Sequence, residues 1–80
     1  MITSAQLRAA RALLRWTAED LSEKSGIGVA TIRRFELSTG VPSVNLKTIQ
    51  SLISAVQSAG VEFIGQAEDG EGVRFAPKRR

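Results

Sequence analysis

The chain has 80 residues and a net charge of +3, from 11 lysine and arginine residues against 8 aspartate and glutamate residues. This length supports one small domain. The absence of cysteine and histidine excludes a disulfide framework, the usual zinc sites and catalysis by either side chain. No apolar run approaches the roughly 18 residues that cross a membrane. Arginines interrupt the apolar positions of residues 1–16, so we expect no signal peptide and a cytoplasmic location.

Charge is distributed unevenly along the chain. Residues 1–16 and 73–80 carry basic side chains and no acid, whereas residues 61–72 carry acids and no base. Separate basic segments suit a polyanion such as nucleic acid, although an ordinary solvated surface has the same composition. The acids are scattered and no glycine-rich phosphate loop is present, so we expect no catalytic residue, no metal and no cofactor.

The first predicted helix begins at Ser4, which we expect to be its N-cap, and ends at Trp16. Leu7, Ala10 and Leu14 recur at helical spacing and predict the buried face of this helix. Trp16 is expected to cover the core at the end of the segment.

Two short helices are predicted next, over residues 18–25 and 29–37. Thr17 is a suitable N-cap for the first of them, with Asp20 three residues later in an imperfect capping box, because Glu or Gln is usual there. Gly26 fits the left-handed position that ends a helix, and Gly28 would be the N-cap of the next. Apolar residues continue across the two glycines, which predicts helices packed on each other through a sharp bend: Leu21, Ile27, Ile32 and Phe35.

Residues 38–42 are predicted to form a loop, because Pro42 cannot lie inside a helix. Either Ser43 or Asn45 would cap a fourth helix that Gly60 ends. Its apolar positions fit one face: Leu46, Ile49, Leu52, Ile53 and Val56.

After Gly60 the apolar period becomes alternating. Residues 61–66 and 73–77 are predicted to be two short strands around the turn-rich segment AEDGEG, with Glu62 and Arg74 paired across an antiparallel ladder. An isolated hairpin is only marginally stable, so it must pack on the helices, pair with another chain or fray. The predicted fold is mainly α, with a helical domain over residues 1–60 and a hairpin with a basic tail over residues 61–80.

The bend also carries a motif, made up of Leu21, Ser22, Gly26, Ile27, Gly28, Ile32, Phe35 and Glu36 and followed by the segment PSVNLKTIQSL. With this motif the chain resembles the phage repressor and Cro type of helix-turn-helix regulators, the Xre family, and the resemblance covers residues 4–60. Ser22 stands where that family usually has alanine, and Ser25 stands where an apolar residue is common.

The resemblance implies a four-helix DNA-binding domain that lays its third helix in the major groove. Val29 and Ala30 suit thymine methyl groups, and Arg34 suits either a bidentate contact to guanine or a phosphate. Arg11 and Glu36 are implied to form a structural ion pair, while Arg8 and Arg15 are expected to be surface charges. Base contacts are implied for Gly28, Val29, Ala30, Thr31 and Arg34, and phosphate contacts for Thr17, Ala18, Arg33, Ser38, Thr39 and Lys47.

Two functions from different classes fit these features. The first is a sequence-specific regulator that binds double-stranded DNA as a homodimer, with the C-terminal strands pairing between chains. The second is an antitoxin or accessory module that uses the same fold to hold a protein partner through its acidic loop and apolar strands. An enzyme fits neither the composition nor the motif.

Overall fold

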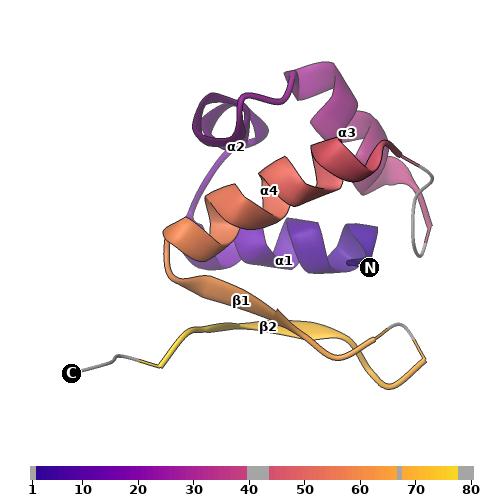
Figure 1. Ribbon diagram of the computed structural model, residues 1–80, viewed down its shortest axis with the longest axis vertical. Helices are drawn as coiled ribbons and strands as arrows, with labels where there is room; N and C mark the ends of the chain where they lie inside the picture. The colour runs from indigo at the N-terminus through magenta and orange to yellow at the C-terminus, as the bar shows by residue number, and fades with distance from the viewer. Residues whose placement is uncertain (1, 40–43, 67, 78–80) are drawn as a thin grey trace.

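The computed structural model describes residues 2–39, 44–66 and 68–77. Four helices precede a two-stranded antiparallel hairpin, so the predicted mainly helical fold is confirmed (Figure 1). The elements are α1 (Ser4–Leu14), α2 (Ala18–Ser25), α3 (Val29–Leu37), α4 (Leu46–Ser58), β1 (Val61–Ile64) and β2 (Gly72–Phe75). Outside the described residues lie the predicted loop residues Gly40, Val41 and Pro42, the alternative cap Ser43, the turn residue Ala67, and the tail residues Lys78, Arg79 and Arg80.

The core takes side chains from all four helices and from β1. Predicted apolar positions supply most of it, because helical spacing places them on one face of each helix. Leu46 is a correction: it is 60 % exposed, because it is the first residue of α4 and the buried face of that helix begins one turn later, at Ile49. The core residues that are at most 2 % exposed are Leu7, Ala10, Leu21, Ile32, Phe35, Ile49, Leu52, Val56 and Val61.

Both ends of α1 differ from the prediction. Thr3, not Ser4, is the N-cap, because Thr3 and Gln6 form a capping box: the Gln6 N–H donates to Thr3 Oγ1 at 3.1 Å, and the Thr3 N–H donates to Gln6 Oε1 at 2.9 Å. The Ser4 hydroxyl instead donates to the Ser38 carbonyl at 2.7 Å. The helix ends at Leu14 rather than Trp16, since Arg15 adopts a left-handed conformation with φ 58°.

The hairpin is shorter than predicted. Gly65, with φ 76°, ends β1 after Ile64, and β2 starts at Gly72 because that residue pairs with Ile64. A Cβ atom at Gly65 would approach the Gly70 carbonyl oxygen to 2.5 Å, so this position requires glycine for both its backbone angle and its space. The predicted Glu62–Arg74 pair is confirmed as a cross-strand ion pair.

The hairpin packs on the helices of its own chain. It lies against α1 and the end of α4, on the side away from α2 and α3 (Figure 1). The Gln6 side-chain amide donates to the Ile64 carbonyl at 3.1 Å and to the Gly72 carbonyl at 2.9 Å, and Thr3 Oγ1 donates to Glu71. One buried side chain of α1 therefore fastens both strands to the helical body and leaves the outer face of α3 uncovered by the hairpin.

Candidate nucleic-acid interface

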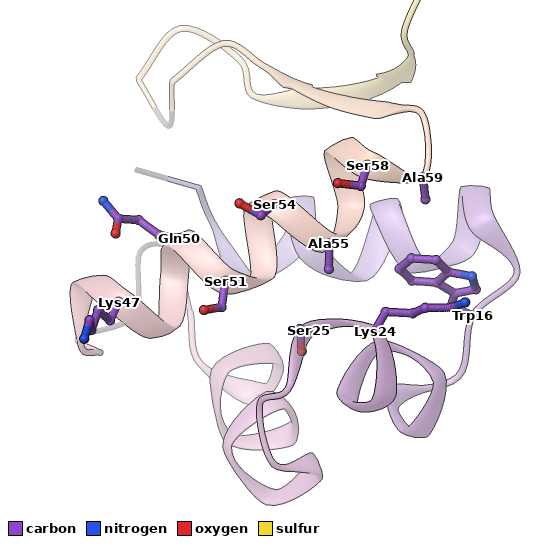
Figure 2. Close-up of a pocket in the computed structure, with 10 residues that line it drawn as sticks. All are labelled: Trp16, Lys24, Ser25, Lys47, Gln50, Ser51, Ser54, Ala55, Ser58 and Ala59. Atoms are coloured by element: carbon purple, nitrogen blue, oxygen red, sulfur yellow. The ribbon is translucent and has the colours of Figure 1, made fainter.

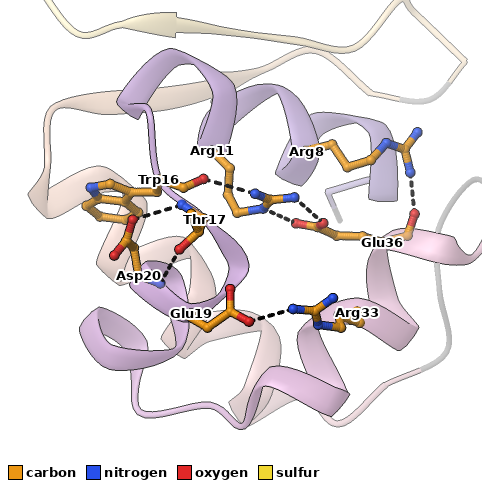
Figure 3. Close-up of polar contacts among 8 residues, drawn as sticks. All are labelled: Arg8, Arg11, Trp16, Thr17, Glu19, Asp20, Arg33 and Glu36. Atoms are coloured by element: carbon orange, nitrogen blue, oxygen red, sulfur yellow. Dashed lines mark hydrogen bonds and ion pairs between the residues drawn. The ribbon is translucent and has the colours of Figure 1, made fainter.

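The N-terminal end of α2 is closed by a reciprocal cap. The Asp20 N–H donates to Thr17 Oγ1 at 3.0 Å, and the Thr17 N–H donates to Asp20 Oδ2 at 2.9 Å (Figure 3). The sequence suggested an imperfect box, but the shorter aspartate completes both hydrogen bonds. The Thr17 hydroxyl accepts one bond here and keeps its own proton available for an outside acceptor.

Two glycines and a serine shape the bend between α2 and α3. Gly26 has φ 76° and ψ 9°, and its N–H donates to the Ser22 carbonyl, which confirms the predicted left-handed end of α2. Ser25 Oγ accepts the Ile27 N–H at 3.1 Å, so the serine at this corner holds the turn by a hydrogen bond instead of by apolar packing. Gly28 is the N-cap of α3, as predicted, and offers no side-chain acceptor to the helix.

One face of α3 is buried and the other is open. Ile32 and Phe35 are at most 1 % exposed, and Glu36 is also buried. Ala30 and Arg34 are exposed on the opposite face, where a partner can reach them. Val29 and Thr31 are half-buried, and Val29 packs partly against the core. Val29 therefore needs no outside partner to explain an apolar side chain at this position.

Arg11 and Glu36 lie behind the open face. Arg11 Nε and Nη2 donate to the two carboxylate oxygens of Glu36, each at 2.7 Å, and Nη1 donates to the Trp16 carbonyl at 2.9 Å (Figure 3). The hydrogen bond to Glu36 is the main reason that the pKa of Arg11 is raised, and burial acts against it. This is the ion pair that the resemblance implies. Arg8, expected to be a surface charge, also donates to the backbone carbonyl of Glu36.

A second ion pair lies on the exposed side of the same elements. Arg33 of α3 donates to the carboxylate of Glu19, the second residue of α2, at 2.5 Å (Figure 3). The pKa of Glu19 is lowered, first by a hydrogen bond from its own backbone N–H and then by the hydrogen bond from Arg33. Arg33 is therefore not a free cation, although the sequence assigned it to a phosphate.

Comparison with known proteins identifies the family of this chain. Residues 7–57, well over half of the chain, match the helix-turn-helix family. The chain belongs to that family, in its phage repressor and Cro type. Its members are DNA-binding regulators, and this chain is one of them. No curated protein matches it. Among the described residues, no helix of this helix-turn-helix protein is long and apolar enough to span a membrane.

The remaining residues that the sequence assigned to phosphate lie after α3. The Ser38 hydroxyl donates to the Arg34 carbonyl at 3.0 Å, and Thr39 is exposed. Asn45 is the N-cap of α4 and accepts the N–H of Lys47 at 2.7 Å. The exposed Lys47 side chain stands at one end of an open groove of about 660 Å³ between α4 and the end of α2, with Trp16 at the other end (Figure 2).

Several features of this helix-turn-helix protein were not predicted from its sequence. The hydrogen bonds from Gln6 to the hairpin and the Glu19–Arg33 ion pair each join residues distant in the chain, and no local sequence pattern indicates either of them. Leu37 ends α3 with 86 % of its surface exposed, although apolar residues on a helix usually predict a buried face. Trp16, expected to cover the core, packs partly against it and also lines the groove.

Proposed function

We propose that the protein is a transcriptional regulator that binds one double-stranded DNA sequence as a homodimer, with α3 in the major groove. The proposal depends on one observation: α3 has one buried face and one exposed face. Ile32, Phe35 and Glu36 fix the helix from behind, and its outer face stays open. A short helix held rigidly by its inner face and free on its outer face is what major-groove reading requires. The cytoplasm is the compartment we propose for it.

The proposed contacts come from two places, the outer face of α3 and the start of α2. Arg34 is exposed on α3 and is the proposed bidentate reader of guanine. The Ala18 N–H at the start of α2 and the Thr17 hydroxyl proton suit a backbone phosphate. The full proposed set comprises base contacts from Gly28, Val29, Ala30, Thr31 and Arg34, and phosphate contacts from Thr17, Ala18, Arg33, Ser38, Thr39 and Lys47.

Homodimerisation through the C-terminal strands completes the proposal. Within the part of the chain that the structure describes, the sheet has two strands, so each strand keeps an outer edge that can pair with another chain. Phe75 on β2 is 58 % exposed and Ile64 on β1 is 38 % exposed, which gives this sheet apolar surface for association. Light scattering at increasing concentration tests the step. A protein that stays monomeric at high concentration would remove it.

Selection of bound sequences from random duplex DNA tests the function. We expect a symmetric enriched motif whose half-sites lie about one helical turn, roughly 34 Å, apart. Arg34→Ala should relax one position of that motif. A variant that keeps the full sequence preference and only binds more weakly would assign Arg34 to a phosphate, and the absence of any enriched sequence would refute the function.

A protein-binding role, as an antitoxin or accessory subunit, is the second candidate. Leu37 and Leu46 favour it, because both are large apolar side chains exposed on either side of the segment that joins α3 to α4. Co-purification with a second protein, together with no salt-dependent DNA binding, would support this role over the first.

A further inference from the structure

The Glu19–Arg33 ion pair lies on the surface that the proposed function turns toward DNA. Glu19 is the second residue of α2, and Arg33 lies about one turn of α3 after Val29 and Ala30 and directly before Arg34. Both side chains are more than half exposed, at 62 % and 58 %. An acid therefore holds one of the arginines that the proposed interface assigns to a phosphate.

The surroundings of Arg33 have room for a phosphate group. Arg33 lines a hollow of about 240 Å³ beside Ala18 at the start of α2, together with Arg8 and Arg11 of α1 and with Glu36 and Leu37 at the end of α3. Arg11 is engaged by Glu36 and the Trp16 carbonyl, and Arg8 donates to a backbone carbonyl. Of the three guanidinium groups in this lining, Arg33 is the one whose described partner is a solvent-exposed acid.

We propose that Glu19 competes with the DNA backbone for Arg33, so that a phosphate entering beside α2 takes the guanidinium from the carboxylate. The inference rests on the proposed function and identifies Glu19 as a residue that lowers the affinity for DNA. A phosphate offers Arg33 a charge-assisted, two-pronged contact, and the positive end of α2 favours the same anion. An exposed ion pair has a small interaction free energy. Breaking the Glu19–Arg33 pair on binding therefore reduces the DNA affinity by only about two- to fivefold.

The opposite role for Glu19 makes the opposite prediction. If Arg33 stayed paired in the complex, it would only neutralise Glu19, and removing Arg33 would hurt most when the acid is present. If the two anions compete, Arg33 gives its full contribution only when Glu19 is absent. Removing Arg33 then hurts most in a protein without the acid. The sign of the coupling between the two substitutions separates these roles.

Four proteins test the proposal: the wild type, Glu19→Gln, Arg33→Gln and the double variant. Each is titrated at several salt concentrations with the duplex that the wild type selects. We expect Glu19→Gln to raise affinity, and Arg33→Gln to weaken binding about two- to fivefold more in the Glu19→Gln background than in the wild type. In that background, Arg33→Gln should also make the negative slope of log affinity against log salt less steep by about 0.9, which corresponds to the loss of one phosphate contact.

Glu23→Gln is the matched control, because Glu23 is another exposed acid on α2. It should leave the effect of Arg33→Gln unchanged. Equal effects of Arg33→Gln in both Glu19 backgrounds, or a larger effect when Glu19 is present, would overturn the competition while leaving sequence-specific binding intact. A wild type that selects no duplex would refute the proposed function itself, and the competition with it.

Discussion

Arg11 and Glu36 are joined by two parallel hydrogen bonds, each 2.7 Å long, that fasten α1 to the last turns of α3. The Glu36 side chain is only 8 % exposed, so losing Arg11 would leave a buried carboxylate without its ion-pair partner. Because Arg11 also donates to the Trp16 carbonyl, the same guanidinium holds the link between α1 and α2. The pair thus fixes the position of α3 from its buried side, next to Ile32 and Phe35.

We expect Arg11→Met to lower the free energy of unfolding by about 3 kcal/mol, because it leaves the buried Glu36 charge without its partner. Urea denaturation followed by circular dichroism measures the change. The control is the double variant Arg11→Met/Glu36→Leu, which should recover most of the loss since no buried charge remains. A double variant as unstable as the sum of both single variants would contradict this reading.

Gln6→Leu should loosen the hairpin. The carbonyls of Ile64 and Gly72 lose a buried donor and the Thr3 N–H at the start of α1 loses its acceptor, and an unpaired polar group costs about 2 kcal/mol. Hydrogen exchange should show faster exchange at the hairpin amides while the core of α4 stays protected. Gln57→Leu, at an exposed position of α4, is the matched control and should leave hairpin exchange unchanged. Uniformly faster exchange in all elements would show that Gln6 stabilises the whole fold instead.

Arg15→Gly should stabilise the protein by about 0.5–1 kcal/mol. Arg15 is the one non-glycine residue with positive φ among the described residues, and a side chain makes that conformation unfavourable. Part of the gain is offset, because glycine also increases the entropy of the unfolded chain. A higher midpoint of urea denaturation with an unchanged slope would confirm the effect. Arg15→Ala separates loss of charge from relief of the backbone, and it should not reproduce the gain.

The pKa of the Glu19 carboxyl should lie below the ordinary value of about 4.3 in an NMR titration. Because the pKa is lower in the folded state, Glu19 contributes stability above its unfolded pKa. That contribution disappears as the pH falls through the lower folded pKa. Arg33→Gln should restore only part of the shift, since the hydrogen bond from the Glu19 backbone N–H is the larger cause. Complete restoration would mean that Arg33 alone produces the shift.

The local parts of the fold could be predicted from the sequence. The bounds of α2 and α3 follow from Thr17, Gly26 and Gly28, because caps and left-handed glycines act within one turn. The cross-strand partners Glu62 and Arg74 follow from alternation alone. The prediction of Ser4 as the N-cap of α1 was wrong. Thr3 and Ser4 are both suitable caps, and the choice depends on which one finds a partner at the third helical position.

The long-range contacts could not be predicted in the same way. The sequence left open whether the hairpin packs, pairs or frays, and the answer depends on a buried Gln6 that lies 58 and 66 residues from its partners. Similarly, Glu19 and Arg33 are 14 residues apart on different helices, so only the angle between α2 and α3 brings them together. Arg11 and Glu36 are 25 residues apart, and only the family resemblance pointed to their pairing.

We propose that the outer face of α3 binds DNA. The most direct measurement is a series of NMR spectra of the isotope-labelled protein, titrated with the duplex that it selects. We expect the largest changes in backbone amide signals at residues 28–34 and at residues 17–19 at the start of α2, with the hairpin signals little affected. Changes confined to the hairpin, with the signals of α3 unmoved at saturation, would contradict it.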